Sequence, residues 1–343
     1  MTKIFPFLFL VSIFSNHLLS QPVSNPALHQ LLLQGIDQSG QQKYSEAKKT
    51  FERSIAAAPN HPAGYLNKAI LFEVMSLDFE TPTPAEFLSL LESSKQLSEA
   101  MIEKDEDSWE GHYYLGMAHS YIAYYKFRDG KNWLSGLTHG LKASSYLGDC
   151  VELNPRAYDA FTGRGTYLYW KSKKMSFLTW TPFVSDESGT GISMLREAEK
   201  KATYTNSQAS NSLLWIFIDE EKFSEAETIA RAMLKKYPMN RLFLWGLASA
   251  LEKQRKWKEA RETYELIVRS IDSEVIERRY IEVQARAKIA LMSYEFGDMQ
   301  TAKREGNWVL SNSSFDRSGF TSDGEERIEK RVREVKKMFG KMQ

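Results

Sequence analysis

Residues 223–226 read FSEA and residues 257–260 read WKEA, and these two short stretches decide the fold. In each stretch a large apolar residue stands three positions before an alanine, and the two stretches start 34 residues apart. Residues 44–47 (YSEA) and 299–302 (MQTA) follow the same pattern. An internal interval of about 34 residues is typical of an array in which each repeat is a pair of antiparallel helices.

Other positions of the pattern recur around these stretches. The matching residues are Gly35, Phe51 and Pro59 around the first stretch, Pro238 after the second and Tyr264 after the third. Small residues let paired helices approach closely, an aromatic side chain wedges between them, and a proline stops the second helix. On these residues the chain resembles the tetratricopeptide-repeat superfamily.

The resemblance implies an all-α protein, a right-handed α-solenoid of about seven helical hairpins with a C-terminal capping helix. We expect the array to cover residues 21–322 and the cap residues 323–343. The hairpins are expected near residues 27–59, 62–104, 108–155, 156–204, 207–238, 241–271 and 280–311. The third is longer than the family pattern, which predicts helices extended by about two turns each. The resemblance also implies a concave surface built from the first helix of each hairpin. It does not indicate which ligand that surface binds.

The first twenty residues have the composition of a secretory signal peptide. Lys3 precedes an apolar run of eleven residues, from Ile4 to Phe14, which is too short to span a bilayer as a helix. We expect cleavage after Ser20 and an exported product, periplasmic or secreted, that is soluble. An uncleaved N-terminal anchor is the alternative.

Net charge and cysteine content exclude some classes of function. The chain has 45 Lys and Arg against 44 Asp and Glu, and removal of residues 1–20 subtracts one lysine and leaves the two signs equal. Nucleic-acid binding needs an excess of basic residues on one face, so no nucleic-acid partner is expected. Cys150 is the single cysteine and can form no internal disulfide.

No motif of a catalytic or cofactor site is present, so the sequence predicts a protein that is not an enzyme and has no cofactor or metal. His112 and His119 lie two helical turns apart, about 10 Å, which is too far for one metal ion. The run Gly189-Thr190-Gly191 before a predicted helix at Ile192 could cradle an anion, but a plain helix-start turn is the stronger interpretation.

Aromatic residues concentrate in the third and fourth hairpins. Seventeen Phe, Trp and Tyr residues lie between Trp109 and Phe183, a region that also contains a predicted long loop from Lys174 to Gly191. Core packing explains many of them, but adjacent residues such as Tyr113 and Tyr114 point about 100° apart on a helix and rarely fit one core. We therefore predict a partner-binding surface with aromatic anchors and arginine hydrogen bonds. Its candidate residues are Tyr113, Tyr124, Arg128, Arg164, Trp170, Trp180 and Phe183.

The last segment, from Glu325 to Gln343, carries mostly basic charges. Its apolar residues lie on one helical stripe, namely Ile328, Val332, Val335, Met338 and Phe339. A cap over the last hairpin is the favoured interpretation. Contact with an anionic membrane surface is the alternative.

Two classes of function fit these patterns. The first is a non-enzymatic scaffold of the bacterial cell envelope that binds a protein or peptide segment on the concave face. The second is a carrier that holds a small molecule or lipid in an aromatic pocket of the third and fourth hairpins. The first is favoured because open superhelices present grooves more readily than closed cavities.

Overall fold

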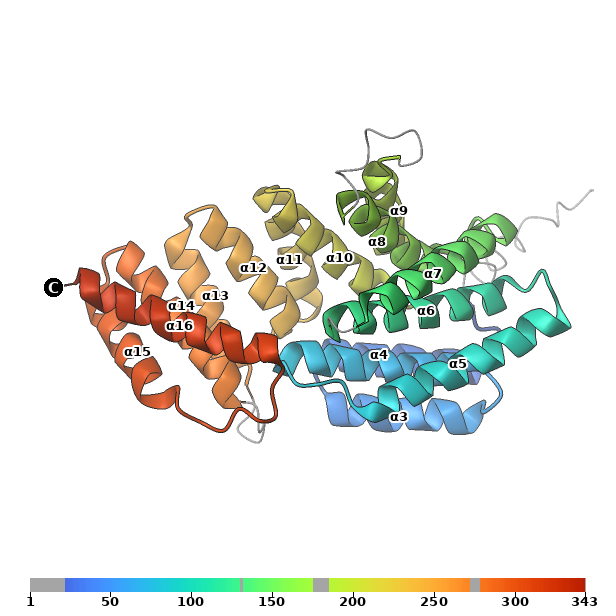
Figure 1. Ribbon diagram of the computed structural model, residues 1–343, viewed down its shortest axis with the longest axis horizontal. Coiled ribbons are helices and arrows are strands. Elements are labelled where there is room, and N and C mark those ends of the chain that lie inside the picture. Colours follow the sequence, from blue (N-terminus) through green and yellow to red (C-terminus); the bar gives the residue numbers. More distant parts are fainter. Residues whose placement is uncertain (1–21, 130–131, 175–184, 272–277, 343) are drawn as a thin grey trace, which may run out of the picture. The chain divides into compact units, whose positions relative to one another are not determined.

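The computed structural model describes residues 22–129, 132–174, 185–271 and 278–342, and every regular element in these ranges is a helix (Figure 1). The helices are α2 (Pro26–Gly40), α3 (Tyr44–Ala57), α4 (Pro62–Phe79), α5 (Ala85–Lys104), α6 (Trp109–Asp129), α7 (Trp133–Leu153), α8 (Tyr158–Lys174) and α9 (Ser188–Lys201). They continue with α10 (Asn206–Asp219), α11 (Phe223–Lys236), α12 (Arg241–Lys253), α13 (Trp257–Arg269), α14 (Arg278–Glu295), α15 (Met299–Asn312) and α16 (Ser322–Lys341).

Within these ranges the helices form seven consecutive pairs and a final helix. The all-helical hairpin array with a last helix, predicted from the sequence, is therefore confirmed. The expected signal peptide falls on residues 1–20, which lie outside the described residues. None of the helices in the described ranges combines the length and the apolar composition that a bilayer crossing requires.

The four stretches that decide the fold begin the second helices of four pairs, at residues 44, 223, 257 and 299. Two positions before each start, the backbone is left-handed, with φ of 61° at Gln42, 58° at Glu221, 58° at Arg255 and 91° at Gly297. The residue that follows donates its backbone N–H to a carbonyl five positions back, as in Lys256 to Leu251 at 2.9 Å. This is the Schellman ending of a helix. One turn geometry therefore recurs in four hairpins.

The alanines of these stretches are buried where paired helices meet. Ala47, Ala226, Ala260 and Ala302 have no exposed surface. A glycine has the same role at the crossing of α10 and α12, because a Cβ on Gly246 would lie 2.3 Å from a methyl carbon of Leu214. Small residues at these points allow the close approach that the repeat requires.

The chain forms two compact units, and their boundary passes through α2 to α5. Unit 1 contains residues 22–33, 53–66 and 91–206, with α6 to α9. In it, α6 packs on α7 and α8 packs on α9. The buried carboxylate of Asp159, at the start of α8, accepts the backbone N–H groups of Tyr204 and Thr205, both at 2.8 Å, and so fixes the segment between α9 and α10.

Helix α9 begins at Ser188, although the sequence predicted a start at Ile192 after a loop ending at Gly191. Gly191 is buried within the helix, and a Cβ there would lie 2.5 Å from the carbonyl oxygen of Gly165 on α8. The glycine is required by this backbone contact. Gly189 and Gly191 therefore do not form an open anion cradle before the helix.

Unit 2 contains residues 34–52, 67–90 and 207–342. Helices α11 to α15 pack each on the next along the chain, and α16 packs on α14 and α15. The apolar stripe of α16 faces inward, since Ile328, Val335 and Met338 are buried. This side of α16 is consequently not available for a membrane.

Candidate functional site

The candidate site is the outer surface of the α6–α7 hairpin in unit 1. Each of the two helices is 21 residues long, as expected from the extra turns predicted for the third hairpin. They approach closely at Gly116, where a Cβ would lie 2.7 Å from Cγ of the fully buried Leu147. The two helices are therefore closely packed at this crossing.

Large apolar side chains are exposed on this hairpin. On α7, Leu134, Leu137 and Leu141 are 62%, 39% and 56% exposed. Their spacing of three and four residues places them on one side of the helix. On α6, Tyr124 and Phe127 are 44% and 50% exposed, and the ring of Phe127 contacts α7 beside Gly136. We call these five residues the α6–α7 apolar surface.

The apolar surface is distinguished by how many of the exposed large hydrophobic residues it holds. Of the eleven large hydrophobic residues that are exposed in the described part of the chain, five belong to it. Isolated exposed hydrophobic residues are normal. The three leucines on one side of α7 are a candidate interaction site, because neighbouring exposed apolar side chains on a soluble protein usually mark such a site.

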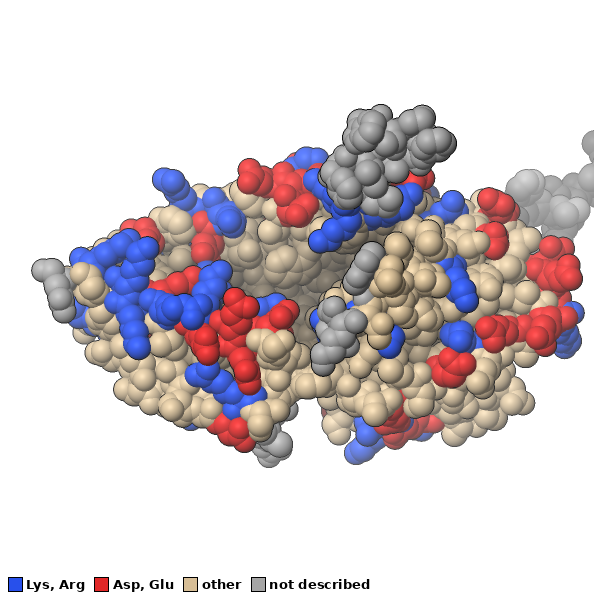
Figure 2. Space-filling model, in the orientation of Figure 1, with Lys and Arg blue, Asp and Glu red and all other residues tan. Residues whose placement is uncertain are grey.

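The charge around this surface is basic. No Asp or Glu occurs between Gly111 and Arg128, or between Lys131 and Gly148. The Arg128 guanidinium lies 6.0 Å from the ring centroid of Tyr124, and Lys126 lies 5.7 Å from that of Tyr125. Figure 2 shows mainly uncharged surface over the N-terminal half of α7, with scattered Lys and Arg side chains.

Tyr113 was predicted as a surface anchor, but its exposed fraction is 3%. Tyr114 is also buried, and the two rings pack edge to face with centroids 4.8 Å apart. The prediction that such a pair does not fit one core fails here because α6 is enclosed on several sides. It packs on α7 and α8, and the Tyr114 hydroxyl donates to the Pro22 carbonyl at 2.8 Å.

The other predicted anchors are distributed over unit 1. Tyr124 and Arg128 lie together on the apolar surface. Arg164, on α8, is half-buried beside Gly148 of α7, and Trp170 is half-buried against the ring of Tyr169. Trp180 and Phe183 lie outside the described residues. The sequence analysis did not include Phe127, Leu134, Leu137 and Leu141, although the spacing of the three leucines was a signal that could have revealed them.

A part-buried histidine pair joins α6 to α7. His119 Nδ1 and His139 Nδ1 are 2.8 Å apart, and the His119 ring stacks on Tyr146. The pKa of His119 is lowered to about 4, mainly by burial and in smaller part by the neighbouring His139. The sequence analysis considered His119 only together with His112, and it missed the pairing with His139, which comes from the opposite helix. Among the described residues, no group of three or more His, Cys, Asp and Glu could hold a metal ion.

Cys150 is fully buried on α7. Burial raises the pKa of its thiol above the ordinary value, so the reactive thiolate form is disfavoured. This cysteine is a packed core residue of the hairpin.

Comparison with known proteins places the strongest sequence signal in unit 2. A tetratricopeptide-repeat family model matches residues 213–275, which contain the stretches at 223–226 and 257–260. No curated protein sequence matches the chain.

Several solved structures are similar in fold. A thermophilic tetratricopeptide-repeat protein of Thermus thermophilus is 17% identical, with 65% of this chain and 98% of that one covered and a TM-score of 0.42. PilF of Pseudomonas aeruginosa is 14% identical, with 78% and 96% covered and a TM-score of 0.48. The C-terminal part of a tetratricopeptide-repeat protein of Cytophaga hutchinsonii is 14% identical, with 87% and 98% covered and a TM-score of 0.46.

These structural similarities are too distant to indicate a function, and the family match carries the conclusion. Residues 213–275 match the tetratricopeptide-repeat family model, and the chain resembles the tetratricopeptide-repeat superfamily as its sequence predicted.

Proposed function

We propose that the protein is a non-enzymatic scaffold of the bacterial cell envelope that binds a protein or peptide segment on the α6–α7 apolar surface. The observation that carries the proposal is the concentration of exposed large hydrophobic residues on this one hairpin. Tetratricopeptide repeats, which residues 213–275 match, commonly hold protein partners on their helical surfaces.

The composition of the surface favours a protein partner. Exposed Tyr124 and Phe127 with Arg128 beside them are residue types enriched in the cores of protein interfaces. The alternative, a carrier with an aromatic pocket, would need aromatic side chains around a cavity in this region. Tyr113 and Tyr169 are packed in the core instead.

The proposal is tested by placing charges on the apolar surface. A photo-crosslinking residue at position 137, introduced into cells that produce the protein, should give a covalent adduct with a protein. The variant Leu134→Glu/Leu141→Glu should abolish this adduct, because two carboxylates at an apolar contact must be desolvated on binding. Its melting temperature should be unchanged, since both side chains are exposed.

Leu153→Glu is the matched control. Leu153 is on the same helix and 40% exposed, but it lies on another side of it. The adduct formed by the crosslinking residue at position 137 should persist in this variant. Equal adducts in all variants would contradict binding at this surface, and adducts with lipid alone would favour the carrier.

Export is tested separately by the mature N-terminus. Mass spectrometry of the protein from the periplasm or medium should find a chain beginning near Gln21. A mature protein that retains Lys3 would contradict the signal peptide.

A further inference from the structure

Three lysines from three helices of unit 1 converge around one histidine. Lys95 of α5, Lys126 of α6 and Lys142 of α7 all act on the ring of His139. The pKa of this ring is lowered mainly by burial, the three positive charges act in the same direction, and Glu92 opposes them. The charges therefore gather at one place beside the α6–α7 hairpin. We call the three residues the lysine cluster.

Only one member of the lysine cluster is paired with a carboxylate in the described part of the chain. Lys95 forms an ion pair with Glu92 at 2.9 Å. Among the described residues, no ion pair joins Lys126 or Lys142 to a carboxylate, and Lys142 is exposed. Lys126 lies 5.7 Å from the ring centroid of Tyr125. Two positive charges are thus left for a binding partner.

The lysine cluster adjoins the exposed leucines of α7. Leu134, Leu137 and Leu141 lie within a sector of about 60° around the helix axis. Lys142 lies about 80° from Leu134, and the exposed Thr138 is between them. This part of α7 therefore presents an apolar stripe with positive charge along one side.

The acidic residues of α7 lie near its other end. Asp149 and Glu152 follow Leu141 by about 12 Å and 16 Å along the helix axis. Asp149 also lies 3.7 Å from His112 of α6. The leucine stripe is consequently flanked by lysine and not by carboxylates of its own helix.

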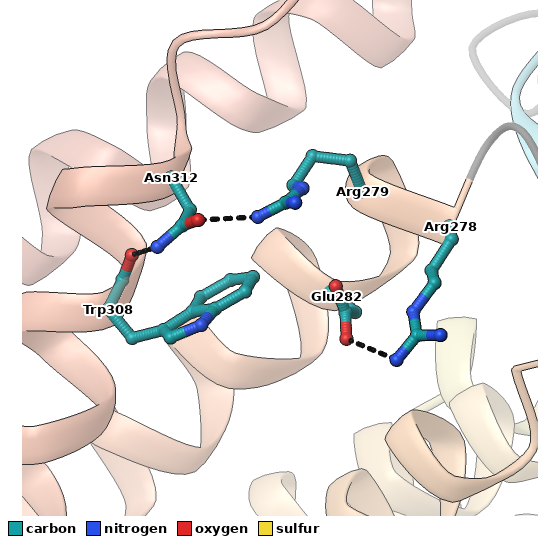
Figure 3. A pocket seen from close by; sticks show the side chains of 5 residues that line it. All are labelled: Arg278, Arg279, Glu282, Trp308 and Asn312. Carbon is teal, nitrogen blue, oxygen red and sulfur yellow. Dashed lines mark hydrogen bonds and ion pairs between the residues drawn. The ribbon is translucent and has the colours of Figure 1, made fainter. Parts of the chain in front are cut away.

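Arginines in unit 2 do not offer a comparable surface. A pocket between α14 and α15 is lined by Arg278, Arg279, Glu282, Trp308 and Asn312 (Figure 3). Arg278 forms an ion pair with Glu282 at 3.3 Å, and Arg279 donates to Asn312. Each guanidinium is directed to a partner of its own, so the two do not converge on one acidic group.

On the basis of the proposed function, we infer that the leucines of α7 bind an amphipathic helix of the partner protein whose apolar stripe is flanked by acidic residues. Apolar side chains that recur every three and four residues are the anchors of one helix packed on another. Acidic side chains along the edge of the bound helix lie toward Lys126 and Lys142. These complementary charges favour one orientation of the helix and disfavour basic partners.

Fluorescence anisotropy with labelled synthetic helices tests this inference on the purified full chain. Three helices of five turns, about 18 residues, share a leucine stripe and carry Glu, Gln or Lys at the flanking positions. At low ionic strength the Glu helix should bind roughly three- to tenfold more tightly than the Gln helix, and the Lys helix should bind most weakly. High salt should reduce these differences, because it screens exposed charges.

The variant Lys126→Gln/Lys142→Gln should remove the preference for acidic residues. It should weaken binding of the Glu helix by roughly three- to tenfold and leave binding of the Gln helix within about twofold. Lys336→Gln/Lys337→Gln is the matched control, because it removes two exposed lysines from α16 in unit 2. Both affinities should stay within about twofold in the control. If the first variant lowers the melting temperature, Lys142→Gln alone replaces it.

Leu134→Ala/Leu141→Ala separates the apolar contact from the charge. It should weaken the Glu and Gln helices by a similar factor, because both lose the same apolar area. Equal binding of the Glu and Gln helices, lost in this variant, would overturn the acidic partner and leave the proposed function standing. The crosslink at position 137 tests that function independently.

Three further results would overturn the inference. The first is that none of the three helices binds, and the second is an equal loss of Glu-helix affinity in the two lysine variants. The third is binding to phosphatidylglycerol vesicles that requires the same leucines and is not reduced by the Glu helix, which would favour a membrane surface.

Discussion

Asp78 and Arg241 form a buried ion pair in unit 2. The Arg241 Nε donates to Asp78 Oδ1 at 2.8 Å, and the Tyr44 hydroxyl donates to Asp78 Oδ2 at 2.9 Å. The Asp78 side chain is 0% exposed and the Arg241 side chain is 4% exposed. Asp78 and Arg241 come from distant parts of the chain, so this pair joins α4 to α12.

Removal of the aspartate should destabilise unit 2 strongly. Asp78→Ala leaves the Arg241 guanidinium buried without its carboxylate, which costs about 3 to 5 kcal/mol in the free energy of unfolding. Denaturant unfolding measures this loss. Glu329→Ala removes a 59% exposed partner of Arg333 and should change stability by less than about 0.5 kcal/mol. Equal effects would mean that the buried pair contributes no more than a surface pair.

The His119–His139 pair should make unit 1 sensitive to mild acid. The pKa of both rings is lowered, that of His119 to about 4. Burial is the largest cause, Lys95 and Lys142 act in the same direction, and Glu92 opposes them. Below pH 6.5 the unfolded chain binds a proton that the folded one does not. Stability is therefore complete above pH 6.5 and is lost as the pH falls toward 4.

Between pH 7.5 and 5 the lowered pKa of His119 should cost about 1 to 2 kcal/mol. The measurement is thermal unfolding at the two pH values, with the His119 ring followed by NMR. The His119→Gln/His139→Gln variant should lose less stability over the same interval. A His119 resonance that titrates near pH 6.5 in the folded protein would contradict the prediction.

Periodicity predicts which side of a helix is apolar, but not how many neighbours enclose the helix. Tyr113 was predicted as an exposed anchor for this reason, and it is buried. The pairing of His119 with His139 and of Arg279 with Asn312 depends on which helices face each other across a hairpin. Such contacts appear only when both helices have been placed.

At the scale of elements, the crossing of α8 and α9 depends on two glycines. A Cβ on Gly191 would lie 2.5 Å from the Gly165 oxygen and 2.9 Å from the Tyr169 nitrogen. Both are backbone atoms, which cannot move without shifting a helix. Gly189, two positions earlier, has nothing within 4 Å of a Cβ.

Gly191→Ala should therefore cost about 2 kcal/mol or more, because the two helices must separate. Gly189→Ala should be neutral or should stabilise by up to about 1 kcal/mol, because alanine is the better helix former. Thermal unfolding of the two variants compares the same chemical change at two sites of one helix. A similar loss in both would show that the crossing is not at Gly191.

The helix starts were predictable where one of the four repeated stretches directly follows the turn that ends the preceding helix. The four starts at 44, 223, 257 and 299 follow the same Schellman turn, although Gly297 is the one glycine among the four left-handed residues. The start of α9 was missed because glycine usually signals the end of a helix, whereas Gly191 is needed for packing. A glycine in a sequence does not show which of these reasons applies.

At the scale of the molecule, the number of hairpins and the final helix followed from the interval of 34 residues and from apolar spacing. A repeat cannot bury its apolar side alone, so the array must continue until a cap covers it. The candidate site did not follow from this logic. The α6–α7 apolar surface and the lysine cluster beside it are departures from the repeat, and the repeat pattern carries no information about them.

The last prediction concerns α16 as the cap of unit 2. Val335 has no exposed surface, and the adjacent Lys336 is exposed. Val335→Asp places a carboxylate against α14 and should cost about 3 kcal/mol or more, because the helix must undock or bury an unpaired charge. Lys336→Asp introduces the same side chain one position away and should cost less than about 1 kcal/mol. Hydrogen exchange in Val335→Asp should then rise along α14 and α15, on which α16 packs. Unchanged exchange there, with only α16 unfolded, would mean that the last hairpin is stable without a cap.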